Sequence, residues 1–349
     1  MATKQADYWR ERFAQLEEAA NRQGLSACAD LEIQYRKAQQ ELEAKISVWY
    51  QRFADNNQIS LAEARKWLTE KDLAEFRWSV QDYIKYGREN AFNGAWMQQL
   101  ENASARFHIS RLDALKLHTQ QSAEVMFGNQ LDTVDAAMRK VYSGDYYHTA
   151  YEIQKGIGIG WDIAAIDQNK LSKVLSKPWA VDGKNFSERI WGNKNKLINE
   201  LHTELTHNIM LGKAPDKAIE NIAKKLGTSK YNAGRLVMTE SAYFSAAARK
   251  DCFGDLGVED YENIATLDNS TSDICRRIDG TVFSMKDYEP GVTAPPFHVL
   301  CRTTTAPHFK DDFEGPGERA ARGEDGKTYY VPATMKYSEW RKEYVKQPQ

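Results

Sequence analysis

The stretch Tyr261-Glu-Asn-Ile-Ala-Thr-Leu-Asp-Asn-Ser-Thr-Ser-Asp-Ile-Cys-Arg-Arg-Ile-Asp-Gly280 marks a change in the character of the chain. It opens with a short β-like run, Tyr261–Leu267, passes through polar turn residues and ends at the turn Asp279-Gly280. A second β-like run, Thr281–Phe283, follows directly. Short apolar runs bounded by Gly, Pro, Asn and Asp are typical of strands and turns. We therefore expect a small α+β module here, extending to Phe309.

The chain before this stretch is typical of helices. No proline precedes Pro178, and that long segment is rich in Ala, Glu, Gln, Lys and Leu, which favour helices. Apolar residues recur at spacings of three and four, which places them on one helical face. One such face comprises Leu42, Ile46, Trp49, Tyr50 and Phe53. Further helices are predicted over about 186–212, 215–227 and 231–252.

A change in composition near 143–160 predicts a turn-rich joint between helical regions. The segment Lys155-Gly-Ile-Gly-Ile-Gly-Trp161 contributes most of its glycines. It has no preceding apolar strand and lacks the Gly-Lys-Ser/Thr ending of a phosphate-binding loop, which argues against a nucleotide site.

These patterns together predict an α+β, mainly α fold in four parts. A helical N-terminal region spans 1–142 and a helical middle region spans 143–234. A small α+β module spans 235–310, and the tail 311–349 is expected to carry a short strand and a short helix. The strand prediction rests on Gly326–Pro332, and the helix on the spacing of Tyr337, Trp340 and Tyr344.

Composition excludes several classes of protein. The 349 residues include 47 Lys+Arg against 49 Asp+Glu, a balance that argues against a protein that coats nucleic acid. Local basic segments remain candidates for DNA contact, at Lys184–Lys196, Lys224-Lys225 and Lys230. The chain shows no secretory or membrane-spanning segment, and four cysteines are too few for a disulfide scaffold. A soluble protein made in a reducing cytoplasm is expected.

The densest polar cluster contains Cys275, His298 and Cys301, in the pattern C-x22-H-x2-C. Thiolate and imidazole are the usual ligands of zinc. A fourth ligand would come from a nearby carboxylate: Asp268, Asp273 or Asp279. Ser272 stands where a C-x2-C knuckle would carry another cysteine. The sequence leaves three interpretations open, namely a metal site, a thiol pair or disulfide between the cysteines, and plain buried packing.

Two further patterns contain residue types found in catalytic sites. Cys301 and His298 are residue types of a nucleophile–base pair, but no third orienting group or substrate-binding feature accompanies them. Ser270-Thr271-Ser272 resembles a step of some ADP-ribosyltransferases, but the Glu-x-Glu expected downstream is missing. Neither pattern identifies a catalytic residue.

Several segments resemble the Mu F-like domain of the minor head, or head morphogenesis, protein family of tailed bacteriophages. They are Arg235–Ser241, Ala265–Cys275, Ile278–Phe283 and Pro295–Thr305. Their order and gaps match the family over about 235–310, and weaker similarity, including Trp179–Trp191, reaches back to about 145. Many relatives carry C-x2-C where Ser272 and Cys275 stand, and His-Pro-x-Cys-Arg-Cys where this chain has 298–303. Both differences remove sulfur ligands.

The resemblance implies a phage minor capsid protein without enzymatic activity. Such a protein would act in procapsid assembly, and further in DNA packaging or ejection. Its expected partners are the portal protein and procapsid or scaffold components, with double-stranded DNA as a further candidate and no membrane. Its expected place is the virion or procapsid interior near the portal vertex, and the host cytoplasm during assembly. The alternative is a toxin-like or nuclease-like enzyme that uses the Asp268–Arg302 cluster.

Residues of this cluster are expected to form a structural knot that holds a small module rigid without a large core. Its members are Asp268, Cys275, Asp279, His298, Cys301 and Arg302. Arg235 and Glu240, on the preceding helix, are expected to cap or pair with this knot. A structural zinc at Cys275, His298 and Cys301 is the one candidate cofactor.

Overall fold

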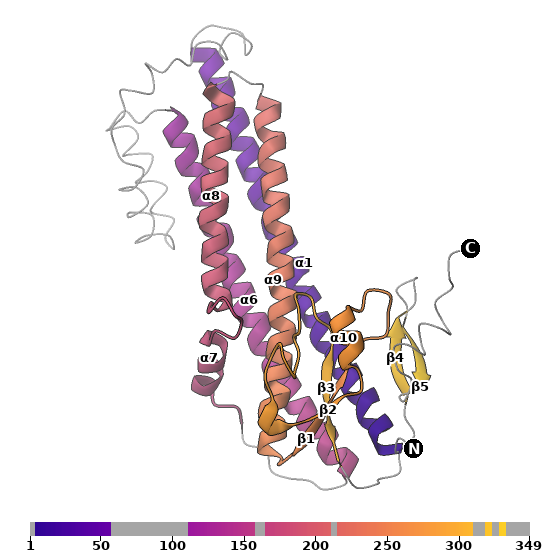
Figure 1. Cartoon of the computed structure of the whole chain (residues 1–349). Helices are drawn as coiled ribbons and strands as arrows, with labels where there is room; N and C mark the ends of the chain where they lie inside the picture. The colour runs from indigo at the N-terminus through magenta and orange to yellow at the C-terminus, as the bar shows by residue number, and fades with distance from the viewer. Residues whose placement is uncertain are drawn as a thin grey trace, which may run out of the picture. The chain divides into compact units, whose positions relative to one another are not determined.

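The computed structural model describes residues 4–56, 111–157, 165–210, 215–309, 318–322 and 328–332. Its described part is mainly helical with a small antiparallel sheet (Figure 1), which confirms the predicted α+β, mainly α class. The helices are α1 (Lys4–Asn56), α6 (Arg111–Ile157), α7 (Gln168–Ser176), α8 (Phe186–Met210), α9 (Pro215–Asp255) and α10 (Asp273–Ile278). None of these helices is long and apolar enough to cross a membrane.

Five strands belong to two sheets. They are β1 (Asp260–Ile264), β2 (Val282–Ser284), β3 (Thr304–His308), β4 (Glu318–Arg322) and β5 (Thr328–Pro332), and a short 3-10 helix, η1 (Met285–Asp287), follows β2. The first sheet has the order β2-β1-β3 and the second pairs β4 with β5, all antiparallel.

The chain divides into two compact units, each assembled from separate stretches. Unit 1 comprises Met1–Cys28, Val134–Phe186 and Gly234–Gln349, and unit 2 comprises Ala29–Thr133 and Ser187–Ala233. The sequence predicts four consecutive parts, whereas each of these units combines stretches that are distant along the chain. The predicted domain boundaries stay predictions.

Unit 2 has a core of aliphatic and aromatic side chains from long helices. On α1 the buried positions Leu31, Tyr35, Leu42 and Ile46 follow the helical repeat. Leu42 and Ile46 are therefore buried as expected, and the side chains of Trp49, Tyr50 and Phe53 lie outside the described residues. Other helices of the unit contribute Leu115, Phe127, Ile190, Leu197, Leu201, Leu205, Ile222 and Leu226. Each such burial stabilises the fold by about 1.5–3 kcal/mol before the entropy of ordering is counted.

Helix α6 continues through 143–157, so the predicted turn-rich joint is wrong for these residues. Gly156 is needed there for packing, because a Cβ on it would collide with the rings of Trp9 and Tyr8. Trp9 is 1% exposed, so α1 and α6 approach closely at this point of unit 1. A glycine in a helix can mark such an approach as well as a turn. The rest of the predicted joint, 158–160, lies outside the described residues.

Helix α8 confirms the prediction over about 186–212 as far as Met210. The predicted stop at Gly227 is wrong, because α9 is one continuous helix from Pro215 to Asp255. A glycine inside a helix costs only about 1 kcal/mol relative to alanine. The buried residues Leu226 and Ala233 on either side of it outweigh that cost.

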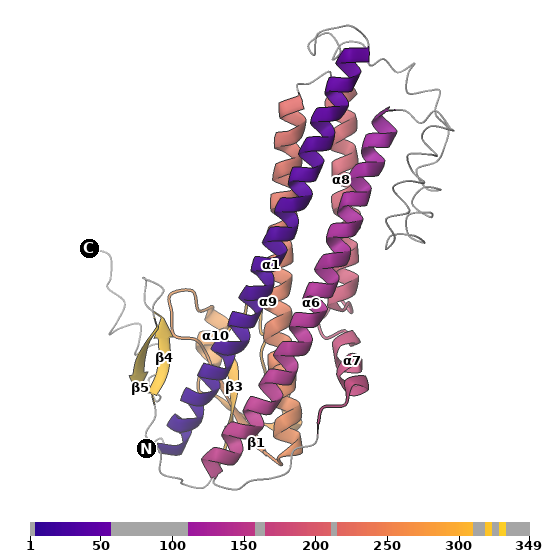
Figure 2. The same ribbon diagram turned by 180° about the vertical axis from the view of Figure 1, so that it is seen from behind.

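In unit 1 the three-stranded sheet packs on the first turns of α1 (Figure 2). Trp9 and Phe13 share a buried apolar cluster with Phe253 at the end of α9 and with Tyr261 on β1. β1 is the central strand, and Tyr261 pairs with a residue of β2 on one side and of β3 on the other. The sheet is therefore fixed to α1 and α9, and its loops carry the polar cluster described next.

The β4–β5 hairpin lies in the C-terminal tail. β5 confirms the strand predicted over Gly326–Pro332, as far as its residues are described. Its partner β4, Glu-Arg-Ala-Ala-Arg, was not predicted because it has no β-branched or aromatic residue. The predicted helix around Tyr337, Trp340 and Tyr344 lies outside the described residues.

Candidate functional site

A short helix positions the first cysteine of the site. α10 begins after Ser272, whose hydroxyl accepts a hydrogen bond from the backbone N–H of Cys275 at 3.3 Å. Ser272 therefore acts as an N-cap at the place where a C-x2-C knuckle would need a cysteine. The helix ends before Gly280, which has a φ of +73° and donates its N–H to the carbonyl of Asn263 on β1. The sheet thus fixes α10 at its C-terminal end.

Cys275, His298 and Cys301 come together at this point, and we call them the triad. The two sulfur atoms lie 3.7 Å apart, and the Sγ of Cys275 lies 3.2 Å from Nε2 of His298. Their ligand atoms all lie within 4.8 Å of one another. Both cysteines are buried and unbridged, whereas His298 is partly exposed.

The imidazole of His298 is oriented by the backbone. Its Nδ1 lies 2.8 Å from the carbonyl oxygen of Val299, an atom that accepts hydrogen bonds and cannot donate them. This contact assigns the ring hydrogen to Nδ1, so Nε2 presents a lone pair toward Cys275.

The two thiols differ in acidity. The hydrogen bond from Cys275 lowers the pKa of Cys301 to about 7, although burial opposes this change. The same hydrogen bond, together with burial, raises the pKa of Cys275. The hydrogen bond between the two thiols therefore stabilises a thiolate in this pair, and the thiolate is the form that binds metals or reacts.

The nearby carboxylates have other partners. Asp268 lies 2.5 Å from the guanidinium of Arg302 and accepts the N–H of Ser270. Burial raises the pKa of Asp268, but the hydrogen bond and charge of Arg302 outweigh burial, and the net result is a lowered pKa. Asp279 accepts the N–H of Ala265 at 2.8 Å, and the exposed Asp273 pairs with Arg276.

The predicted knot therefore consists of separate contacts within one module. The triad is one, and the ion pair between Asp268 and Arg302 is another. Among the described residues, the group of His, Cys and carboxylate side chains that could hold a metal contains the triad alone. None of the three aspartates considered as a fourth ligand belongs to it.

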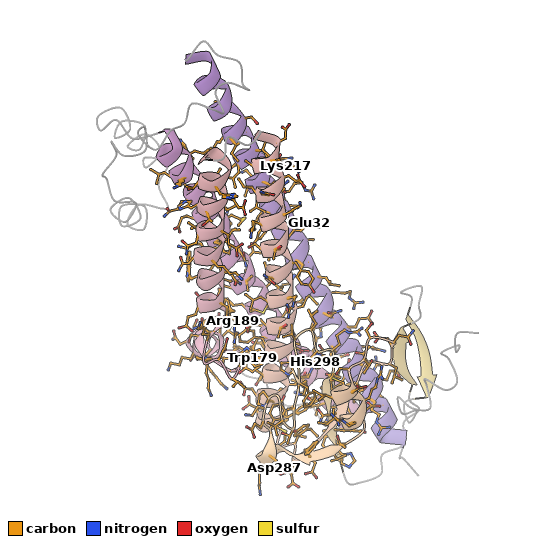
Figure 3. The ribbon with its side chains drawn as sticks, turned by 45° about the horizontal axis from the view of Figure 1, so that its top comes forward. Glu32, Trp179, Arg189, Lys217, Asp287 and His298 are labelled. Carbon is orange, nitrogen blue, oxygen red and sulfur yellow. The ribbon has the colours of Figure 1, made fainter. Side chains whose placement is uncertain are left out.

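The supporting residues Arg235 and Glu240 lie on α9. Glu240 is 1% exposed and accepts a hydrogen bond from the indole of Trp179 at 2.9 Å. The carbonyl of Arg235 accepts from the hydroxyl of Thr239, which in turn accepts the N–H of Leu300 from the loop that carries His298. Figure 3 labels Trp179 and His298 in unit 1. The triad loop is thus held to α9 through Thr239, a residue that sequence reasoning did not select.

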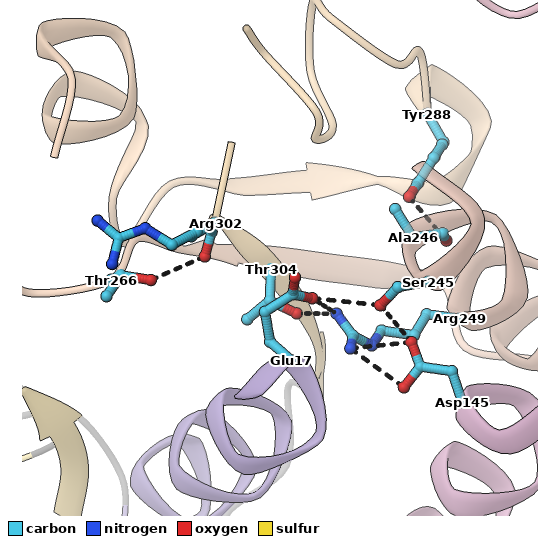
Figure 4. A network of polar contacts seen from close by, with 9 residues as sticks. All are labelled: Glu17, Asp145, Ser245, Ala246, Arg249, Thr266, Tyr288, Arg302 and Thr304. Atoms are coloured by element: carbon cyan, nitrogen blue, oxygen red, sulfur yellow. Dashed lines mark hydrogen bonds and ion pairs between the residues drawn. The ribbon is translucent and has the colours of Figure 1, made fainter. Parts of the chain in front are cut away.

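Sequence reasoning also missed a buried ionic network centred on Arg249 (Figure 4). Arg249 of α9 is 0% exposed and donates to Glu17 of α1 at 2.7 Å and to Asp145 of α6 at 3.1 Å. It also donates to Thr304 of β3, and the hydroxyl of Ser245 donates to both carboxylates. We call Glu17, Asp145, Ser245, Arg249 and Thr304 the Arg249 network.

A weak signal for this network exists in the sequence. Glu17 stands between Phe13 and Ala20 at helical spacing, so a charge interrupts a face that is otherwise apolar. Its partners, however, lie far away along the chain, and the sequence alone does not pair them. Burial raises the pKa of Asp145 to about 6, with Glu17 acting in the same direction and Arg249 opposing it.

Comparison with known proteins supports the predicted resemblance. Residues 199–306 match the family model described as phage Mu protein F like protein. This range holds all of α9, the strands β1 and β2, helix α10 and the whole triad. Over these residues the chain is similar to the Mu F-like family, which indicates a domain related to phage head proteins. No curated protein and no solved structure matches the chain.

Proposed function

We propose that this chain is a minor component of the phage head that associates with the portal vertex and acts by contact, without enzymatic turnover. The observation that carries the proposal is the family match over 199–306. The matched residues build the module around β1 and the triad, and they include Arg249, which links that module to α1 and α6. A rigid module on long helices suits an adaptor that must present fixed surfaces to an assembly.

The polar residues of the module support a role without turnover. Asp268 and Arg302 would carry the chemistry of a nuclease-like or toxin-like enzyme, but they pair with each other. The hydroxyl of Thr266 also donates to the carbonyl of Arg302 at 2.8 Å (Figure 4). These groups maintain the fold of the loop, which is the use expected of them in a structural protein.

Contact with double-stranded DNA is a separate part of the proposal, and it rests on lysines of unit 2. In unit 2, Lys194 is buried against Glu124, and Lys224 and Lys225 each lie near a glutamate. Lys230 pairs with Glu32, which Figure 3 labels on α1. The pairs of Lys224, Lys225 and Lys230 are exposed, and exposed pairs are weak and can exchange for phosphates, whereas Lys194 is buried. A binding assay would show a steep loss of affinity with salt if the lysines contact DNA, and the same weak signal at all salt concentrations if they do not.

The portal association is tested by assembling heads with and without the portal protein. The tagged chain is co-expressed with the capsid, scaffold and portal proteins of the same genome, and particles are separated by sedimentation. We expect the chain in procapsids that contain portal and its loss from particles assembled without portal. A chain that sediments free of particles, or that enters both kinds equally, would contradict the proposed association.

The proposed interior location is tested on the same particles. Protease added to intact procapsids should spare the chain, whereas protease added after the shells are opened should cleave it. Cleavage in intact procapsids would place the chain outside the shell.

A further inference from the structure

We propose that the triad binds one zinc ion and leaves the fourth coordination position open to a small exogenous ligand such as water. The proposal concerns Cys275, His298 and Cys301, and it is independent of the portal association. It specifies three protein ligands, one borderline-soft divalent cation and one exchangeable ligand.

The distances fit such an ion. Zinc lies about 2.3 Å from thiolate sulfur and about 2.0–2.1 Å from imidazole nitrogen, so tetrahedral ligands lie about 3.8 Å apart for two sulfurs and about 3.6 Å apart for sulfur and nitrogen. The two sulfurs of the triad are 3.7 Å apart, and the distance from the sulfur of Cys275 to Nε2 of His298 is 3.2 Å. All three ligand atoms lie within 4.8 Å of one another, so one ion can lie between them.

The imidazole is what distinguishes a metal site from a pair of packed thiols. Two thiols that are only packed in van der Waals contact would also lie about as close together as the two sulfurs of the triad. A third ligand atom facing them, from a residue that is partly exposed, is not needed for packing. Donation of Nδ1–H to a backbone carbonyl is the usual second contact of a metal-binding histidine, and His298 makes it with Val299. The lone pair on Nε2 is thereby available to a cation.

The open position follows from the residues around the triad. Asp268, Asp273 and Asp279 are engaged with Arg302, Arg276 and the N–H of Ala265. The hydroxyl of Ser272 caps α10. Within the described residues no other His, Cys or carboxylate joins the group. A zinc site with three protein ligands takes water or another exogenous ligand in the fourth position.

The first experiment measures metal in the full-length chain purified under reducing conditions. We expect about one zinc per chain after dialysis against metal-free buffer. The Cys275→Ser and His298→Gln variants should lower zinc affinity at least about tenfold in competition with a chromophoric chelator. Cys28→Ser is the matched control, because Cys28 lies on α1 outside the triad and should bind zinc as the unmodified chain does.

Three outcomes would overturn the zinc site. One is a chain without zinc that also fails to take up added zinc. Another is unchanged affinity in both triad variants while their helix content, measured by circular dichroism, matches the unmodified chain. The third is a mass lower by two hydrogens with peptide mapping to a Cys275–Cys301 disulfide in the freshly purified chain. His298→Gln keeps both sulfurs, so it reports on the site even if the cysteine variant fails to fold.

The second experiment tests the open position with cobalt in place of zinc. Cobalt bound by two thiolates and an imidazole should give sulfur-to-metal charge-transfer bands and visible bands of a tetrahedral ion. Adding azide or a small thiol should shift the visible bands, because these ligands replace water. Bands that stay unchanged at saturating azide and thiol would show a closed site and overturn the proposal of an exchangeable ligand.

Discussion

The triad and the Arg249 network both stabilise the module around β1, but they do so by opposite means. The triad joins residues 23 and 26 positions apart and uses two buried thiols and a partly exposed imidazole. The network joins residues 104 and 232 positions apart and uses charged groups that are largely buried. Closure of a short loop can be predicted from residue spacing, whereas pairing of distant charges follows from the tertiary fold. We therefore expect substitutions in the triad and in the Arg249 network to affect stability differently.

The largest effect is expected for Arg249→Met, which breaks the network from its centre. The change leaves Glu17 and Asp145 buried without their cation, and breaking a buried pair in this way costs about 3–5 kcal/mol. Urea denaturation followed by circular dichroism should show a correspondingly lower midpoint with an unchanged slope.

The matched control is Arg139→Met on α6. Arg139 forms a half-exposed pair with Asp135 at i,i+4 spacing, and such pairs contribute about 0.3–0.5 kcal/mol. Similar losses of unfolding free energy in the two variants would show that burial of the Arg249 ion pairs does not make them more stabilising than an exposed pair.

The next effect concerns the triad and depends on metal. A ligand that binds the folded chain alone stabilises it by about 2.7 kcal/mol at a free concentration 100-fold above its Kd. Thermal unfolding should therefore shift to higher temperature on adding zinc to the metal-free chain. His298→Gln should lose most of this shift, while Arg249→Met should keep it, because the network does not touch the ligand atoms. An equal zinc-induced rise in unfolding temperature in His298→Gln would show that the stabilising zinc does not bind at the triad.

The difference between the two regions also explains how far sequence reasoning reached. Cys275, His298 and Cys301 were selected from residue type and spacing, and the structure brings them together because α10 and one loop are close along the chain. The predictions at Gly156 and Gly227 are wrong because the sequence does not distinguish a glycine at a turn from a glycine inside a helix, where it allows a close helix contact or is merely tolerated. Thr239 and Arg249 were missed as site residues because their roles depend on partners that only the tertiary fold supplies.

A smaller effect should appear in the pH dependence of the network. Burial raises the pKa of Asp145 from its ordinary 3.8 to about 6, so the folded state binds this proton more tightly than the unfolded state does. Protonation of Asp145 therefore contributes fully to the free energy of unfolding below about pH 4. Roughly 2 kcal/mol of this contribution is lost as the pH rises to about 6. The unfolding free energy of the unmodified chain minus that of Asp145→Asn should fall across this interval. A difference that rises from pH 4 to 6 would mean that Arg249 outweighs burial.

The smallest effect is expected at Asp268, and its pH dependence should have the opposite sign. Arg302 holds the pKa of this carboxyl below its ordinary 3.8, so the ionised form is favoured in the folded state. The contribution is present above that value and is lost as pH falls through the lowered pKa. Because the Arg302 side chain is 28% exposed, solvent screens the pair, and Asp268→Asn should cost only about 1 kcal/mol at neutral pH. Urea midpoints of Asp268→Asn and the unmodified chain should converge as pH falls toward 3. Midpoints that converge as the pH is raised would show that burial controls the pKa of Asp268, as it does at Asp145. The partly exposed pair and the buried network would then not differ in their pH dependence.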